Sequence, residues 1–262
     1  MNRKVSSGIR DDFESGFHPD WVRFAIGHAG IEHETGVARL LVDGAVPGEL
    51  SDAELDDHRT APRWKLKWSP PLRLIVRARF SHPSGDLRGT AGFGFWNDPF
   101  DWVGNVQSPP NSIWFFYASR ESDMAFVRGA PGSGWKAAFI NGGRANRFVM
   151  AAANFVFRIP GMSKLVFAAA ERRLDAAEAV LDIDLREWHE YQIDWGRHDA
   201  SFRVDGSQIL RAPNPPNVPL GFVAWVDNNA TSIGAGKEFS FTRIAVPGRQ
   251  WMEISLIEIS LL

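Results

Sequence analysis

The sequence predicts an all-β protein in which two antiparallel sheets pack face to face as a sandwich. Short stretches rich in aromatic and branched residues recur along the chain, and Gly, Pro, Asn and Asp separate them, as is typical of strands and turns. Hydrophobic residues make up 44% of the chain, with 19 Phe and 11 Trp, which is enough to fill a large core. The length of 262 residues suits one sandwich, so we expect a single domain over residues 1–262.

Eight stretches alternate in polarity or have the branched and aromatic content of strands. They are residues 37–43, 72–80, 92–96, 112–118, 189–195, 200–204, 221–226 and 239–246. Asp205 and Gly206 directly follow one of them, and this dipeptide is a strong signal for a two-residue hairpin turn.

Residues 44–67 are polar and interrupt this pattern. Their DAELDDH stretch carries five acidic or histidine side chains in seven positions. Because no fixed spacing of metal ligands recurs there, we expect a solvated surface loop and not a metal site.

A second interruption, residues 161–181, predicts an amphipathic helix. Ser163 is a suitable N-cap, and apolar residues follow near helical spacing at Leu165, Ala169, Leu174, Ala177 and Leu181. Residues 148–160 before it are strongly apolar but too short to span a bilayer. We therefore expect a helical insertion around residues 146–181 that packs on the sandwich; peripheral membrane contact through residues 148–167 is the alternative.

The remaining composition narrows the class of protein. A formal charge of -2 does not favour nucleic acid as a partner. The chain has no cysteine, which excludes disulfides, thiolate metal sites and cysteine nucleophiles.

The first residues lack the apolar segment of a secretory signal, so we expect a cytoplasmic protein with no membrane span. The apolar tail at residues 251–262 predicts an edge strand, paired within the sandwich or with a second subunit.

Residues 187–210, EWHEYQIDWGRHDASFRVDGSQIL, resemble the family 16 glycoside hydrolases and their concanavalin A-like relatives. The matching elements are a Trp-His-x-Tyr strand, an Asp-Trp step and a strand that ends in Val-Asp-Gly, here Trp188, His189, Tyr191, Asp194, Trp195, Val204, Asp205 and Gly206. Two further stretches lie where the family's strand order would place them: DDFESGFHPDWVRF resembles its opening strand, and PLGFVAWVDN resembles the late strand that lines its cleft. The resemblance implies a jelly-roll sandwich with a ligand cleft on its concave sheet, and a structural role for His189.

The strand that carries catalysis in this family reads Glu-x-Asp-x-Glu, and the matching strand here is NSIWFFYAS. Its inward positions would be Ser112, Trp114 and Phe116, which include no carboxylate. A retaining glycosidase needs two carboxyl groups about 5 Å apart, so the resemblance predicts that this mechanism is lost. Thr242 stands where the family's calcium-binding Asp is expected, and we predict neither a metal nor a cofactor.

Seven residues are candidates for binding a small molecule or an oligosaccharide in the cleft. Aromatic faces stack on sugar rings, and short polar side chains hydrogen-bond hydroxyl groups. The candidates are Trp96, Ser112, Trp114, Phe116, Trp225, Asp227 and Asn229. A purely structural role for Trp225 in the core is equally open. Asp98 and Asp227 are candidates for proton transfer.

Three functions remain open at this stage. The first is non-hydrolytic binding of a carbohydrate or glycoconjugate. The second is a cyclase or isomerase with an apolar cleft that restrains a hydrophobic substrate. The third is a glycosidase with displaced carboxylates, for which the sequence offers the pairs Glu32 with Glu34, Asp182 with Asp184, and Asp98 with Asp101.

Overall fold

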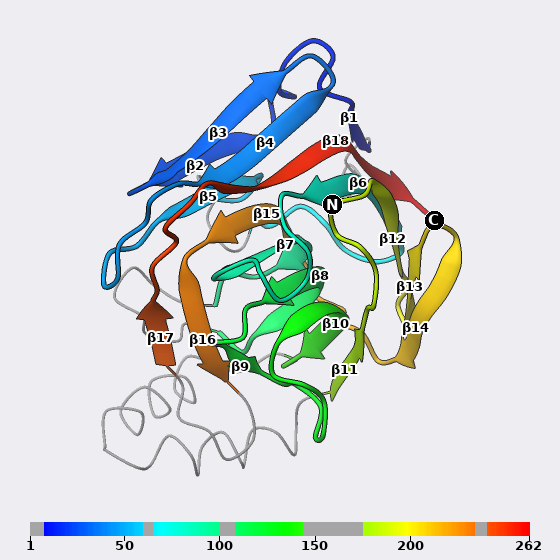
Figure 1. Ribbon diagram of the computed structural model, residues 1–262. Coiled ribbons are helices and arrows are strands. Elements are labelled where there is room, and N and C mark those ends of the chain that lie inside the picture. Colours follow the sequence, from blue (N-terminus) through cyan, green and yellow to red (C-terminus); the bar gives the residue numbers. More distant parts are fainter. Residues whose placement is uncertain (1–7, 60–64, 100–107, 144–174, 234–239) are drawn as a thin grey trace.

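The computed structural model describes residues 8–59, 65–99, 108–143, 175–233 and 240–262. Two large, mainly antiparallel sheets face each other and a small third sheet lies beside them (Figure 1). Within these ranges every regular element is a strand. The predicted all-β sandwich of two antiparallel sheets is confirmed.

One large sheet has eight strands. In spatial order it contains β14 (Ser207–Pro213), β13 (Asp199–Val204), β12 (His189–Trp195), β6 (Leu72–Phe80), β18 (Gln250–Leu261), β4 (Val37–Val42) and β3 (Ala29–Glu34), and β1 (Ile9–Asp11) pairs with β18.

The other large sheet has seven strands. Its order is β11 (Asp175–Val180), β10 (Gly134–Asn141), β8 (Asn111–Ala118), β7 (Thr90–Trp96), β15 (Gly221–Asp227), β5 (Asp52–Asp56) and β2 (Val22–Ile26). The small sheet contains β17 (Ser240–Arg243), β16 (Asn229–Ile233) and β9 (Asp123–Met124).

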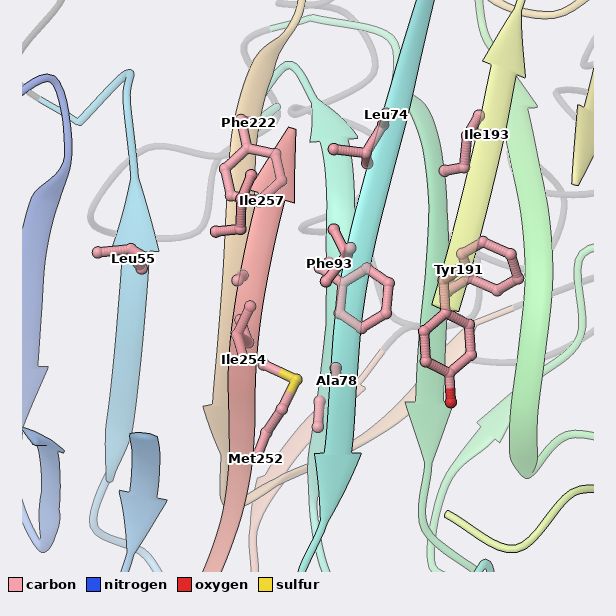
Figure 2. Close-up of a cluster of buried hydrophobic side chains, with 14 of the residues drawn as sticks. Leu55, Leu74, Ala78, Phe93, Tyr191, Ile193, Phe222, Met252, Ile254 and Ile257 are labelled. Carbon is pink, nitrogen blue, oxygen red and sulfur yellow. The ribbon is translucent and has the colours of Figure 1, made fainter. Parts of the chain in front are cut away.

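A continuous apolar core fills the space between the two large sheets (Figure 2). At its centre the rings of Phe93 and Phe115 each lie 5.1 Å from Tyr191, centroid to centroid, and Trp135 lies 5.6 Å from Tyr191. All four side chains are almost completely buried. Since successive residues of a strand point to opposite faces, this packing turns the residues between them toward the outer face of the seven-stranded sheet.

Three expectations from the sequence are wrong. Residues 52–56 lie in the expected surface loop but form the buried strand β5, in which Ala53 and Leu55 enter the core. Residues 175–180, expected at the end of a helix, form strand β11, which pairs antiparallel with β10; residues 144–174 lie outside the described residues. The tail strand β18 is not an edge strand, because it lies between β6 and β4.

The reason for each error is physical. In β5 the strict alternation of acidic and apolar residues is a strand pattern, but acidic residues are uncommon in strands and concealed it. In β11 the alanines fit either structure, and pairing with β10 decides between them. The hairpin prediction is correct: Asp205 and Gly206 both have positive φ, 49° and 78°, and join β13 to β14.

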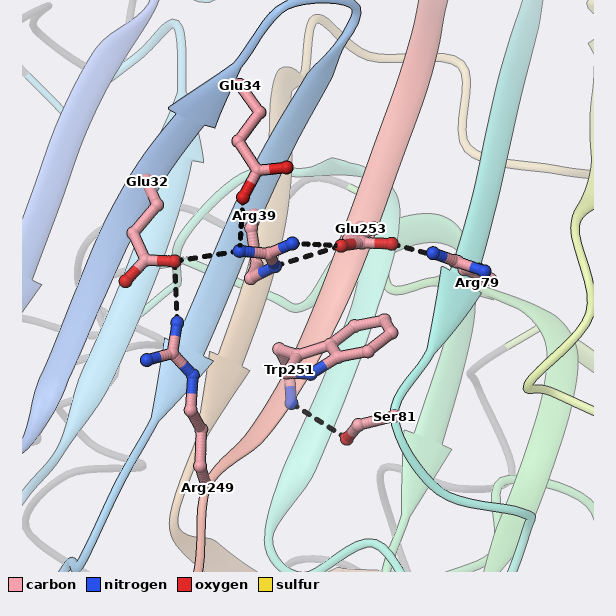
Figure 3. Close-up of polar contacts among 8 residues, drawn as sticks. All are labelled: Glu32, Glu34, Arg39, Arg79, Ser81, Arg249, Trp251 and Glu253. Atoms are coloured by element: carbon pink, nitrogen blue, oxygen red, sulfur yellow. Dashed lines mark hydrogen bonds and ion pairs between the residues drawn. The ribbon is translucent and has the colours of Figure 1, made fainter.

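Charged side chains form a ladder across the outer face of the eight-stranded sheet (Figure 3). Glu253 of β18, only 3% exposed, accepts hydrogen bonds from Arg39 at 2.9 and 2.5 Å and from Arg79 at 2.7 Å. Arg39 also contacts Glu32 and Glu34, the first carboxylate pair considered for catalysis. That pair therefore serves an ion-pair network on the face opposite to the seven-stranded sheet.

We expect Glu253→Gln to destabilise the fold by about 1–3 kcal/mol, because it removes charged hydrogen bonds that join three neighbouring strands. Urea unfolding monitored by tryptophan fluorescence measures the change. Glu34→Gln is the matched control, since Glu34 is exposed and contacts Arg39 alone. Equal effects of the two substitutions would contradict the central role of Glu253.

Candidate functional site

A cavity of about 250 Å³ hollows the outer face of the seven-stranded sheet. Strands β5, β7, β8, β10 and β15 contribute to its wall, together with the small sheet and neighbouring turns. The residues that line it are Leu50, Asp52, Glu54, Thr90, Trp96, Asn97, Pro99, Pro110, Asn111, Ser112, Trp114, Met124, Phe126, Ile140, Val223, Trp225, Asp227, Asn229, Thr231 and Phe241.

Two glycines of β7 make room for the aromatic wall. A Cβ atom at Gly92 would lie 2.8 Å from the indole of Trp225, and one at Gly94 would lie 2.5 Å from the Cβ of Trp114. Gly94 also has a φ of 153°. An added Cβ would also lie 2.4 Å from a carbonyl oxygen of β8 at either position, that of Phe115 or of Ile113, so the two glycines allow β8 and the tryptophans to lie this close to β7.

Three tryptophans form a continuous wall of the cavity. The centroid of Trp114 lies 6.2 Å from that of Trp96 and 5.3 Å from that of Trp225, with interplanar angles of 37° and 48°. Phe116 packs behind this wall, 5.8 Å from Trp114. The three indoles thus present a curved aromatic surface to whatever fills the cavity.

Hydrogen bonds fix the two outer tryptophans of the wall. The Trp225 Nε1 donates to Thr90 Oγ1 at 2.9 Å, and Thr90 Oγ1 donates to Asp227 Oδ1 at 3.0 Å. The Trp96 Nε1 lies 3.1 Å from His58 Nε2. Because an indole N–H only donates, His58 Nε2 accepts and its Nδ1–H donates to the Phe222 carbonyl at 3.1 Å. His58 is therefore a positioning residue for Trp96.

Another wall comes from Met124 at the end of β9 and from Phe126 in the segment that follows it. The buried Lys136 donates to the Met124 carbonyl at 2.7 Å and lies 3.5 Å from Glu178. Glu178 accepts hydrogen bonds from the backbone N–H groups of Phe126 and Val127 at 3.2 and 3.1 Å. This buried pair fastens the wall to β10 and β11.

Two carboxyl groups lie side by side in the wall of the cavity, on the same two strands that bring Trp225 and Glu54 together. Asp52 of β5 and Asp227 of β15 are direct partners in the antiparallel register, so their side chains share the outer face with Cβ atoms about 5 Å apart. Both are buried, with 9% and 7% exposed. Arg59 pairs instead with the next two carboxylates of β5, Glu54 and Asp56.

The surroundings of the two carboxyl groups differ. Asp227 accepts four hydrogen bonds, from the N–H and Oγ1 of Thr90 and from the N–H and Nδ2 of Asn229, at 2.8–3.0 Å. Burial raises the pKa of Asp227 despite these donors. Burial raises the pKa of Asp52 well above its usual range, and the charge of Asp227 raises it further. We place the shared proton on Asp52, because the four donors favour the ionised form of Asp227.

Besides Glu54 Oε2, which forms an ion pair with Arg59, four buried polar atoms around the cavity have no hydrogen-bond partner among the described residues. They are Asp52 Oδ1, Asn111 Oδ1, Ser112 Oγ and Trp114 Nε1. Unpaired buried donors and acceptors are costly, so their concentration at one cavity points to a polar ligand or ordered water that satisfies them. Together they offer one donor, two acceptors and a hydroxyl that can do either.

The structure gathers most of the residues predicted from the sequence. Six of the seven binding candidates line the cavity: Trp96, Ser112, Trp114, Trp225, Asp227 and Asn229. Phe116 lies behind the wall instead. Asp98 is not among the lining residues, and it interacts electrostatically with Arg59. The role of each residue in binding stays a prediction.

Sequence reasoning missed Asp52, Glu54 and His58, because the segment that holds them was expected to be a loop. The alternation of residues 52–56 was the signal that could have placed Asp52 and Glu54 on one face of a strand. Of the other proposed pairs, Asp184 is exposed and bound to Arg186, and Asp101 lies outside the described residues. His189 bonds Asp205 at 2.6 Å and the Asp184 carbonyl at 3.0 Å, which fits its expected structural role.

Within the described residues, no group of three or more His, Cys, Asp or Glu side chains is arranged to hold a metal ion. None of the elements in the same ranges is a helix long and apolar enough to cross a membrane.

The fold is similar to that of several solved glucanases. A β-glucanase from Bacillus licheniformis aligns with a TM-score of 0.52 and 10% identity over 99% of this chain and 100% of its own. A prokaryotic β-1,3-1,4-glucanase (lichenase) from a mouse hindgut metagenome gives 0.53 and 12% over 98% and 100%. An endo-β-1,3-glucanase from Pyrococcus furiosus gives 0.51 and 12% over 97% and 94%.

These similarities confirm the concanavalin A-like jelly-roll fold and the resemblance to family 16 glycoside hydrolases at the level of structure. No protein-family model matches the sequence, and no curated protein matches it significantly. At 10–12% identity, the similarity defines the fold and leaves the function to the residues of the cavity.

The carboxyl pair gives a test by stability. The folded state holds the Asp52 proton at pH values where the unfolded chain, with an ordinary pKa, has lost it, so stability falls as pH rises from about 4 through the raised pKa. Asp52→Asn cannot ionise, and we expect it to raise the melting temperature at neutral pH and to flatten this dependence.

Asp227→Asn is the contrasting substitution at the partner position. It puts an amide among four donors, and we expect it to destabilise the protein by about 1–3 kcal/mol. Thermal unfolding from acid to neutral pH measures both variants. A lower melting temperature for Asp52→Asn at neutral pH would show that Asp52 is not the proton-bearing partner.

Proposed function

We propose that the protein binds a carbohydrate in the tryptophan-lined cavity. The observation that carries the proposal is the combination of a three-indole wall with four polar atoms that no described residue satisfies, all in one cavity. The apolar faces of a sugar ring stack on indoles, while its hydroxyl groups both donate and accept hydrogen bonds. A cavity of about 250 Å³ has room for a small part of a glycan, one or two rings in size.

Strand β8 contributes binding and not cleavage in this proposal. Its outward residues Ser112, Trp114 and Phe116 hold no group that can act as a carboxylate nucleophile or acid. The similar structures of this fold include glucanases, which supports a carbohydrate as the ligand class. We therefore propose that this jelly roll binds a carbohydrate without hydrolysing it, because β8 lacks the carboxylates that the resemblance to family 16 would place there.

The test is thermal unfolding in the presence of a panel of oligosaccharides, because a ligand that binds only the native state raises its melting temperature. We expect a subset of the glycans to stabilise the wild-type protein. Trp225→Ala should remove this stabilisation by lowering affinity about tenfold or more, since it deletes one of the three indoles of the wall, next to Trp114.

Trp188→Ala is the matched control for loss of an indole. Trp188 stacks with Arg77 and Arg79 of the eight-stranded sheet, away from the cavity, so its removal should leave glycan binding intact. Glycan stabilisation that survives Trp225→Ala, or that Trp188→Ala abolishes equally, would contradict the proposed site.

A second candidate is a small apolar ligand, on which the cavity would act as a cyclase or isomerase. The apolar lining favours it, because Met124, Phe126, Ile140 and Val223 face the same space as the tryptophans. Apolar metabolites belong in the same panel. Stabilisation by these compounds alone would replace the carbohydrate proposal with this one.

A further inference from the structure

We propose that the carbohydrate taken by the cavity is an amino sugar, and that its protonated amine sits between Asp52 and Asp227. This inference rests on the proposed carbohydrate binding and adds to it the charge and functional group of the ligand. Strands β5 and β15 place these two carboxyl groups directly opposite each other in the cavity wall.

Asp52 has a hydrogen-bond acceptor that no described residue satisfies. Its side chain is nine-tenths buried, lines the cavity, and has an Oδ1 atom without a hydrogen-bond partner among the described residues. Asp227, by contrast, is held in place by four donors. A ligand group that enters here meets one firmly oriented carboxylate and one carboxyl group with an open acceptor.

Other charged groups lie near Asp52. Asp227 faces it from β15, and Asp56 adds negative charge from its own strand. Arg59 is the nearby cation and its charge lowers the pKa of Asp52, but its ion pairs are with Glu54 and Asp56. On the other side of β5, strand β2 places Ile26 opposite Asp52 and Phe24 opposite Glu54, neither of which titrates. The site therefore carries excess negative charge.

A ligand group can offset this charge. A hydroxyl group can bond either carboxyl group but brings no charge, whereas an ammonium group adds a positive charge and three donors that can bridge Asp227 and the ionised form of Asp52. Charge-assisted hydrogen bonds of this kind are about twice as strong as neutral ones. The indoles of Trp225 and Trp114 add attraction, because aromatic faces bind cations as well as sugar rings.

Binding of an ammonium group is linked to protons. Burial and Asp227 raise the pKa of Asp52, so the free cavity keeps a proton there to higher pH than an ordinary aspartate does. An ammonium group favours the ionised carboxylate and displaces that proton, which means that binding releases protons to the buffer. Affinity for the amine should therefore fall as pH is lowered through the raised pKa of Asp52, while affinity for a neutral sugar should change far less.

The experiment is calorimetric titration of the full chain with three matched trisaccharides. These are the glucosamine trimer with free amines, its N-acetylated form, and the neutral glucose trimer of the same linkage. We expect the free-amine trimer to bind about tenfold or more tightly than either analogue at neutral pH. Repeating the titration in buffers of different ionisation enthalpy, at an acidic pH where the sugar amine is already fully protonated in solution, should reveal proton release for the free-amine trimer alone.

Asp52→Asn provides the test by substitution. It should weaken binding of the free-amine trimer about 10- to 100-fold and abolish the proton release, with a much smaller loss for the neutral trimer, because the amide keeps a carbonyl oxygen that can accept from a sugar hydroxyl. Asp199→Asn is the matched control, because Asp199 is a surface carboxylate paired with Arg211 on the eight-stranded sheet. The sugar comparison on the wild-type protein needs no variant to fold.

Each other outcome has a defined meaning. Equal or tighter binding of the neutral or N-acetylated trimer overturns the amino-sugar inference and leaves carbohydrate binding standing. Binding of choline or of calcium ions as tight as that of the free-amine trimer overturns it as well, because the sugar then contributes nothing. If none of the three trimers nor any other glycan binds, both the inference and the proposed function fall.

Discussion

The packing of the two sheets around one aromatic core determines where every other residue of the seven-stranded sheet points. Phe93, Phe115, Trp135 and Tyr191 lock together between the sheets, and strand alternation then turns their neighbours outward. The outer face can vary without loss of the core. On β8 this outer face carries Ser112 and Trp114.

The same constraint explains how the cavity acquires its polar groups. Strand β5 contributes Ala53 and Leu55 to the core, so Asp52 and Glu54 must face outward. Its register with β15 then brings Asp52 to Asp227. The acidic side of the cavity and the aromatic side therefore come from adjacent strands, and neither could move without a shift in register that would also expose core residues.

The sequence predicts the sandwich well because its information is local: alternating strands, an Asp-Gly turn and the motif around Tyr191 each suffice on their own. It predicts six lining residues for the same reason, once the family's strand order is assumed. The pairing of Asp52 with Asp227 spans most of the chain and depends on which strands become neighbours. The role of His58 depends on a contact with Trp96 that no local pattern encodes.

The most direct test of the account follows the indole N–H resonances of the tryptophans by NMR during a carbohydrate titration. Trp114 Nε1 is unpartnered in the cavity and Trp225 Nε1 is bonded to Thr90, while Trp188 and Trp251 stack with arginines of the eight-stranded sheet. The account predicts saturable shifts of Trp114 and Trp225, with Trp188 and Trp251 unchanged. Shifts confined to Trp188 and Trp251 would place the binding site on the opposite face and contradict it.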